Sequence, residues 1–404
     1  MTPRDFLNSP NRLAPHYSEF RVGERYLLTG HSHQAWPDCA RQGQREAWQD
    51  AADSVDEKWP RAFEKAEQVR RGFAALMDDP DGLYALGSNT HELLIRFLSA
   101  LPLKKRPRLV TTDGEFHTIR RQLCRLEEEG LEVIRVPASP VEDVAQRLRD
   151  AITDRTAAVL VSSVFFGSGR IVHGLGDVSA RCLELGCELL VDTYHSLNVA
   201  PFSVRDMGLG EAFAVGGGYK YCQLGEGNCF LRVPPARHFR PVITGWFSEF
   251  SALGNKGLND AVSYGQGPDA FAGSTYDPTS HYRAARVFDF FTEMELSPRI
   301  LRQVSQLQIE VLQRSFDDLD LPTSLIDRDR DVSRDQLAGF LALTSPWAEV
   351  ICQELRALEV RTDFRGNCLR LGPAPYLSKD QLLIAMQRLG DAARKVETSL
   401  PSKR

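Results

Sequence analysis

Short apolar runs alternate along the middle of the chain with segments in which apolar residues recur every three or four positions. The runs are rich in Val, Ile, Leu or Phe and are bounded by Gly, Pro or Asp, which is typical of strands in a sheet covered on both faces. They predict strands over Leu109–Thr112, Glu132–Val136, Ala157–Val164, Glu188–Asp192, Ala212–Gly217 and Asn228–Val233. The amphipathic segments predict helices over His91–Leu101, Val141–Ile152 and Leu175–Leu185. This alternation predicts a mostly parallel, doubly wound α/β sheet.

The pattern changes after about residue 278, where two long helices are expected, Ser280–Glu295 and Pro298–Leu319, followed by a smaller α+β tail. The length agrees with such a division, since 404 residues make two or three domains at roughly 150 residues each. We expect an N-terminal arm with a short helix over residues 1–55, a large α/β domain over 56–290 and a smaller C-terminal α+β domain over 291–404. A ligand cleft is expected between the two domains.

The composition is that of an ordinary soluble globular protein and excludes several classes of function. Apolar residues make up 42% and charged residues 25%, and a net charge of −5 offers no long-range attraction to nucleic acid or an anionic membrane. The eight cysteines form no C-x-x-C pair, so we expect reduced, mostly buried thiols in a cytoplasmic protein. The first residues lack the apolar run of a secretory signal, and the longest apolar stretch, Ala157–Phe166, is too short to span a membrane.

An aspartate and a lysine follow two successive predicted strands, at the sheet edge where open parallel sheets bind their ligands. Asp192 ends one strand, and Lys220 follows the next strand within the sequence Gly-Gly-Gly-Tyr-Lys-Tyr. Pyridoxal phosphate (PLP) needs a lysine that forms a Schiff base with its aldehyde and a carboxylate that keeps its ring nitrogen protonated. Taken singly, each has a plainer interpretation, a helix-capping Asp192 and a solvated Lys220. The pair favours the cofactor, because lysine is an unusual choice inside an apolar run.

Two further segments fit the other parts of this cofactor. Gly87–Thr90 precedes a predicted helix, and its N–H groups and hydroxyls suit a phosphate, although a simple N-cap explains them equally well. Phe116 follows another strand and can lie flat on the ring, whereas a core position is the commoner role of Phe. The pair His31 and His33 suggests a metal, but this spacing on an extended segment points the two rings to opposite faces, and we expect no metal site.

The order of these motifs along the chain resembles that of the kynureninase family. The motifs are Gly-Ser-Asn-Thr from residue 87, Glu-Phe-His-Thr from 115, Val-Asp-x-x-His from 191, Gly-Tyr-Lys-Tyr from 218 and Thr-Gly-Trp-Phe from 244. The similarity extends from the Gly-His-Ser segment at residue 30 to the Leu-Arg-Leu-Gly-Pro segment at 369. The resemblance implies the aspartate-aminotransferase fold (fold type I) and bound PLP. The implied activity is hydrolytic cleavage of the Cβ–Cγ bond of L-kynurenine, or of a related γ-keto amino acid, to alanine and an aryl carboxylate.

The resemblance also implies a role for individual residues around the cofactor. Lys220 would carry PLP and shuttle protons. Asp192 would pair with the ring nitrogen, supported by His195, and Phe116 would stack on the ring. Tyr219 would lie beside the lysine, near the phosphate and the reacting carbons. The other cofactor contacts implied are Asn89, Thr90 and Thr118.

Three implied roles concern the partner subunit and the substrate. Trp246 and Thr275 would reach into the neighbouring subunit's site, which implies a homodimer with shared active sites. Arg370 would grip the substrate α-carboxylate, a task suited to a guanidinium that donates two parallel hydrogen bonds. His31 and Ser32 would line the substrate site.

Positions expected near the substrate depart from the family pattern and leave other reactions of the same fold open. Ser248–Phe250 replaces a segment that usually contains His, and Tyr276–Pro278 replaces one with a substrate-side Asn. A class V aminotransferase, a cysteine desulfurase or a β-lyase would use the same lysine and aspartate. A desulfurase also needs a reactive cysteine on a mobile loop well before the carboxylate arginine, whereas Cys352 lies in a helical pattern and Cys368 is only two residues before the expected carboxylate arginine. A non-catalytic binding protein would have no use for the lysine.

Overall fold

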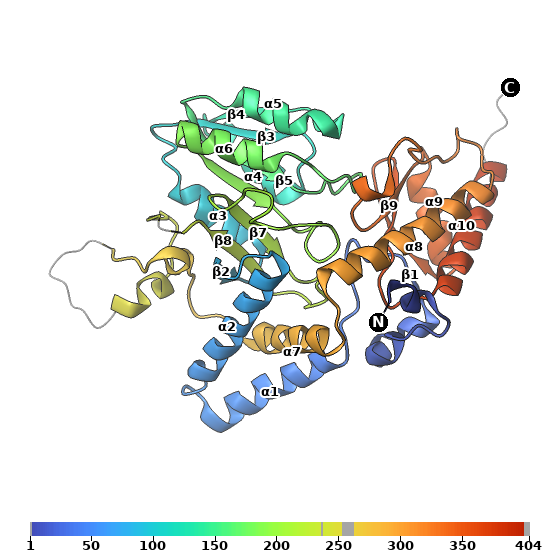
Figure 1. Cartoon of the computed structure of the whole chain (residues 1–404), viewed down its shortest axis with the longest axis horizontal. Helices are drawn as coiled ribbons and strands as arrows, with labels where there is room; N and C mark the ends of the chain where they lie inside the picture. The colour runs from blue at the N-terminus through green and yellow to red at the C-terminus, as the bar shows by residue number, and fades with distance from the viewer. Residues whose placement is uncertain (1, 236, 253–261, 400–404) are drawn as a thin grey trace.

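A seven-stranded sheet forms the centre of the computed structural model, which describes residues 2–235, 237–252 and 262–399 (Figure 1). Its strands, in spatial order, are β2 (Leu83–Gly87), β8 (Cys229–Val233), β7 (Phe213–Gly217), β6 (Glu188–Asp192), β5 (Thr156–Ser162), β3 (Arg108–Thr112) and β4 (Glu132–Val136). The strand β8 runs antiparallel to both of its neighbours, β2 and β7, and the remaining pairs are parallel. The predicted mostly parallel sheet is therefore confirmed.

Helices connect these strands and cover the sheet. They are α3 (Thr90–Ala100), α4 (His117–Glu128), α5 (Val144–Ala151) and α6 (Leu175–Leu185). The predicted apolar stripe of α3 is buried at Leu93, Leu94, Phe97 and Leu98, which confirms the three- and four-residue spacing. The predicted helix from Val141 is shorter than its pattern indicates, because Val141–Asp143 forms a separate 3₁₀ turn after Pro140. The helix α4 buries only Ile119 and Leu123.

Three helices outside the alternating pattern pack beside the sheet. They are α1 (Cys39–Ser54), α2 (Trp59–Leu76) and α7 (Thr279–Glu293), and α7 lies against both others (Figure 1). The α1–α7 approach is close at Gly43, where a Cβ would collide with the carbonyl of Tyr282. The segment before α1 consists of 3₁₀ turns, Pro3–Leu7, Ala14–Phe20 and Val22–Glu24, and a short strand β1 (Tyr26–Leu27).

The C-terminal part is a small sheet with long helices. The helix α8 (Pro298–Asp318) runs from the centre of the molecule along this part (Figure 1). The sheet has the order β11 (Asp363–Arg365), β12 (Cys368–Leu371), β9 (Leu341–Thr344) and is antiparallel. The remaining helices are α9 (Ala348–Ala357) and α10 (Lys379–Ser399), and 3₁₀ turns lie at Trp246–Ala252, Gly267–Phe271 and Arg334–Gln336. The strand β10 (Val360–Arg361) pairs in parallel with β1, so the N-terminal arm is attached to the C-terminal part.

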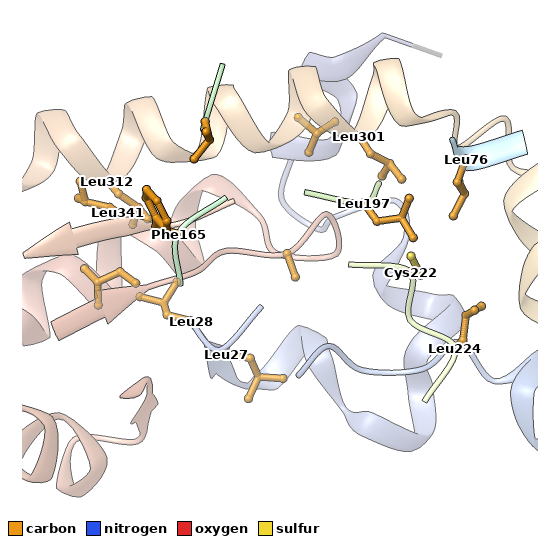
Figure 2. Close-up of a cluster of buried hydrophobic side chains, with 14 of the residues drawn as sticks. Leu27, Leu28, Leu76, Phe165, Leu197, Cys222, Leu224, Leu301, Leu312 and Leu341 are labelled. Atoms are coloured by element: carbon orange, nitrogen blue, oxygen red, sulfur yellow. The ribbon is translucent and has the colours of Figure 1, made fainter. Parts of the chain in front are cut away.

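One hydrophobic cluster continues from the large sheet into the C-terminal part (Figure 2). Its labelled members come from the arm, the helices α2 and α8, the loops after β5, β6 and β7, and the strand β9: Leu27, Leu28, Leu76, Phe165, Leu197, Cys222, Leu224, Leu301, Leu312 and Leu341. Because close-packed side chains resist displacement, this shared core fixes the C-terminal hairpin relative to the strand ends of the large sheet. None of the described helices combines the length and the apolar character needed to cross a membrane.

Candidate active site

The carboxyl ends of β5, β6 and β7 border a cavity of about 490 Å³. Parallel strands end at the same sheet edge, so residues that follow different strands come together here. Eight of the ten predicted cofactor residues line this cavity: Asn89, Thr90, Phe116, Thr118, Asp192, His195, Tyr219 and Lys220. The structure thus brings together the motifs that are separate in the sequence.

Lys220 is buried in the wall of this cavity and is hydrogen-bonded to His195. Lys220 is only 6% exposed, and its Nζ lies 2.7 Å from Nε2 of His195. Burial lowers the pKa of Lys220 to about 7, because an ammonium loses its hydration there. Burial and the charge of Lys220 hold the pKa of His195 well below its usual value, so this imidazole is neutral. Near neutral pH a large share of Lys220 is therefore the free amine, the nucleophilic form.

Aromatic rings surround the lysine. The Nζ of Lys220 lies 4.7 Å from the ring centroid of Tyr194, 5.4 Å from that of Phe116 and 5.8 Å from that of Tyr219. Phe116 is the residue before α4 and meets Phe166 edge to face at 5.3 Å. Tyr194 and Phe166 line the cavity but carry no motif signal, since aromatic residues are common in cores.

A partly buried carboxyl group, Asp192, and a buried one, Glu115, lie at this sheet edge. Oδ1 of Asp192 accepts a hydrogen bond from the backbone N–H of Tyr194 at 2.8 Å, and burial raises the pKa of Asp192 while the charge of Lys220 lowers it. Glu115 accepts from the hydroxyls of Thr112 at 2.7 Å and Ser162 at 2.6 Å. Glu115 is absent from the predicted site, although an acidic residue directly before Phe116 at a strand end is a signal that could have identified it.

Replacing Glu115 by Gln should stabilise the protein above pH 7 and have little effect near pH 5. Burial raises the pKa of Glu115 from its usual 4.5 to about 7. Between these values the folded protein binds more protons than the unfolded chain, so the stability given by the neutral acid falls as the pH rises through 7. The shift corresponds to about 3 kcal/mol at most. Urea unfolding of wild type and Glu115→Gln at pH 5 and pH 8 measures this difference, and an equal effect at both pH values would contradict it.

The start of α3 forms the end of the cavity nearest β2. Asn89 is the N-cap of α3, and its Oδ1 accepts from the N–H of Glu92 at 2.9 Å. The hydroxyl of Ser88 and the amide of Asn89 donate to the carboxylate of Glu92 at 2.9 and 3.2 Å. Asn89 therefore caps the helix, as the plainer interpretation predicts. Ser88, Asn89 and Thr90 also line the cavity, and a helix N-terminus favours an anion there.

The three predicted substrate residues, Arg370, His31 and Ser32, are not among the residues that line this cavity. Arg370 on β12 is buried, and its Nε and Nη2 donate to the two oxygens of Asp363 at 2.9 and 2.5 Å. Nη1 of Arg370 donates at 2.8 Å to the carbonyl of Phe166, a residue of the cavity wall. His31 is 0% exposed and contacts Asp363 through Nε2 at 2.8 Å. The hydroxyl of Ser32 lies 3.1 Å from Nδ1 of His33.

Trp246 and Thr275 also lie outside the cavity of Lys220 within one chain. Thr275 and Asp277 line a neighbouring cavity of about 750 Å³, which shares Ser88, Glu226 and Gly227 with the first cavity. Trp246 lies on the surface with 45% of its area exposed. Oε1 of Glu249, another position of the altered substrate segments, accepts from the N–H of Ser263 at 3.2 Å.

Comparison with solved structures defines the fold around this cavity. A mutant of the enzyme C-DES, with Ala for Lys and with glycine covalently linked to its PLP cofactor, matches with a TM-score of 0.79 and 15% identity over 93% of this chain and 98% of that one. The fold is that of the fold type I PLP enzymes. The cystine C–S lyase C-DES in complex with cysteine persulfide matches with a TM-score of 0.77 and 16% identity, over 92% of this chain and 98% of that one.

A cysteine desulfurase shares the same fold. The apo cysteine desulfurase of Thermococcus onnurineus matches with a TM-score of 0.76 and 16% identity, over 92% of this chain and 95% of that one. Neither a protein-family model nor a curated protein sequence matches the chain. The predicted fold is thus confirmed. The more specific kynureninase prediction receives no support from these three structures, which are described by C–S chemistry.

Proposed function

We propose that this protein is a PLP-dependent enzyme that acts on an amino acid and cleaves a bond at its β-carbon. The observation that carries this proposal is the position of Lys220, buried in a cavity whose wall also holds Asp192. A lysine held out of water, with its pKa lowered to about 7, is costly to a fold unless it has a task. The order of residues along the chain and the fold both agree with the cofactor.

The side chains of the cavity fit the separate parts of PLP. Lys220 offers a partly neutral amine to the aldehyde, Asp192 a carboxylate to the ring nitrogen, and Phe116 a flat face to the ring. The start of α3 offers N–H groups and the hydroxyl of Ser88 to the phosphate. When bound, PLP supplies a conjugated electron sink that stabilises negative charge at the substrate α-carbon. The protein's own part is to hold the ring and to move a proton at Nζ of Lys220, with neutral His195 beside it.

Elimination of a sulfur group from the β-carbon is the reaction that we favour. Its support is the fold likeness to a cystine C–S lyase, together with the state of the cysteines. A desulfurase of the expected kind needs a reactive thiol on a mobile loop. Cys352 lies in α9 and donates to the carbonyl of Thr362 at 3.6 Å, and Cys368 lies on β12 and donates to that of Gly167 at 3.2 Å. Burial raises the pKa of Cys368 to about 11 and also raises that of Cys352, so both remain thiols at neutral pH.

Hydrolytic Cβ–Cγ cleavage of kynurenine or a related γ-keto amino acid is the second candidate. The motifs Gly-Tyr-Lys-Tyr from residue 218 and Thr-Gly-Trp-Phe from 244 favour it. Both candidate reactions break a bond at the β-carbon. They use the same lysine and aspartate, which a class V aminotransferase would also use without breaking a bond at the β-carbon. Products therefore distinguish the reactions.

The proposed enzyme is a homodimer in which Trp246 and Thr275 complete the partner's site. The support is a set of exposed apolar side chains, Val242, Ile243, Trp246 and Phe250, of which Trp246 and Phe250 contact Phe247 of the second cavity. Such a patch on a single chain marks an interaction surface. Light scattering of the purified protein should give the mass of two chains, and a monomer at micromolar concentration would contradict the dimer.

An absorption spectrum followed by product analysis tests the proposed function. The purified protein, supplied with PLP, should show a band near about 420 nm that borohydride treatment removes. The same sample is then given L-cystine or L-kynurenine. Pyruvate and ammonia from cystine would support the lyase, and anthranilate fluorescence from kynurenine the hydrolase. Conversion of the substrate to its 2-oxo acid would indicate an aminotransferase. If no band forms even after PLP is added, the proposed function is wrong.

A further inference from the structure

Arg370 is held by one carboxylate in a fixed geometry. Its Nε and Nη2 make two parallel hydrogen bonds to Asp363, and its Nη1 bonds to the carbonyl of Phe166. The aromatic ring of Phe340 lies against the guanidinium, 5.7 Å from its centre. A guanidinium has five N–H groups, so these three bonds leave one N–H on Nη1 and one on Nη2 for a ligand. The plane of Arg370 is therefore set before any substrate arrives.

The partner Asp363 is built into the same hairpin as the arginine. Asp363 on β11 and Arg370 on β12 are directly opposite each other in the antiparallel register. Directly opposite side chains lie on the same face of a sheet and make close contact. The hairpin itself thus places the two side chains within contact of each other.

His31 supports Asp363 from a distant part of the chain. It is fully buried, and its Nε2 lies 2.8 Å from Oδ1 of Asp363. Burial lowers the pKa of His31 to about 4. Since an ionised carboxylate only accepts, the neutral ring donates from Nε2. Although burial opposes it, the hydrogen bonds from His31 and Arg370 keep the pKa of Asp363 below its usual value, so the carboxylate stays charged.

The cluster of Arg370, Asp363 and His31 lies next to the cavity of Lys220. Phe166, whose carbonyl bonds to Arg370, lines that cavity. Phe340 lies between the groups, with its ring 4.9 Å from that of His31 and 6.1 Å from that of His195. The guanidinium charge is close enough to lower the pKa of Lys220. The guanidinium of Arg370 thus lies directly behind the wall of the cavity that holds Lys220.

We propose that Asp363, supported by His31, is a positioning residue that orients Arg370 to recognise the free α-carboxylate of the substrate. This inference rests on the proposed function. Because Asp363 balances the charge of Arg370, recognition depends on two directed hydrogen bonds more than on charge. The substrate class is therefore α-amino acids with an unmodified carboxylate, and amino acid amides or simple amines are poor ligands. His31 acts through Asp363 and does not touch the substrate.

Ligand titration of the PLP-loaded enzyme tests this role. L-alanine and L-alaninamide are each titrated while the cofactor absorption is recorded. In the wild type the dissociation constant of L-alanine should be at least about ten-fold lower than that of L-alaninamide. Asp363→Asn should raise the constant for L-alanine by at least about ten-fold and change that for L-alaninamide by less than two-fold. A structural defect would weaken both ligands alike.

A double variant and a matched control separate positioning from general damage. Asp363→Asn should have no further effect in an Arg370→Ala background, because both substitutions remove the same interaction. Asp317→Asn is the matched control, since Asp317 accepts from Nε and Nη2 of Arg328 in the same two-bond geometry, away from the cavity. It should bind L-alanine as the wild type does.

Two results would overturn the inference while the proposed function stands. One is wild-type affinity of Asp363→Asn for L-alanine, and the other is additive effects of Asp363→Asn and Arg370→Ala. Failure of the wild-type enzyme to respond spectrally to L-alanine would instead overturn the proposed function and this inference with it.

Discussion

Replacing Lys220 by Ala should remove the borohydride-sensitive absorption band and lower turnover by at least about 10³-fold. Lys220 is the only lysine found at the cavity in the described part of the chain. In the proposed function its Nζ would attach the cofactor, and this atom lies 2.7 Å from His195, in position to move a proton. The change deletes both contributions, whereas the fold should persist, because alanine removes a buried amine that costs solvation energy.

The matched control for this experiment is Lys105→Ala, which removes an exposed lysine in a turn. It should keep the band and the wild-type turnover. Circular dichroism and a thermal melt of both variants establish that they are folded. A Lys220→Ala protein that keeps its borohydride-sensitive band would contradict the assignment of Lys220 and with it the enzyme proposal.

Replacing Arg232 by Met should lower the free energy of unfolding by about 3–5 kcal/mol. Arg232 on β8 is 3% exposed, and its Nε donates to Asp79 at 2.7 Å. Its Nη1 donates to the carbonyls of Gly210 at 2.9 Å and Ala212 at 2.7 Å. The substitution leaves a nearly buried carboxylate and two carbonyls without these donors, and methionine restores only the packing of the stem. Urea unfolding followed by fluorescence measures the loss.

An exposed ion pair provides the comparison for Arg232. The side chains of Arg125 and Glu128 are 57% and 68% exposed, and Arg125→Met should cost less than about 1 kcal/mol. Asp79→Asn combined with Arg232→Met should recover part of the loss, because it removes the uncompensated charge. Equal free energies of unfolding for Arg232→Met and Arg125→Met would contradict the prediction that the buried Arg232–Asp79 pair stabilises the fold more than the exposed pair does.

The strands and the cofactor residues could be predicted from the sequence because their signals are local. The strand Glu188–Asp192 and the helix Leu175–Leu185 have the predicted bounds, since buried apolar runs and amphipathic spacing are set by neighbouring residues. Asp192 and Lys220 could be placed at one sheet edge, because parallel strands end on the same side.

Contacts with partners on other elements could not be predicted in this way. Glu115 stands directly before Phe116 in the sequence, but only the structure shows that its carboxyl group is buried and accepts from Thr112 and Ser162. Asp363 precedes Arg370 by seven residues, which matters only once the hairpin register places them opposite each other. His31 illustrates the same limit, since the structure places it against Asp363 and away from the cavity wall.

The sequence by itself determined six of the seven strands of the large sheet, their alternation with helices, and the lysine and aspartate at the sheet edge. These follow from short-range patterning and from the rule that fixes where parallel strands end. Only the tertiary structure decided how Arg370 is oriented, because that depends on a hairpin of the C-terminal part, a histidine of the N-terminal arm and a carbonyl of the large sheet. These three segments meet through a shared hydrophobic core, and no local pattern records which side chains such packing brings into contact.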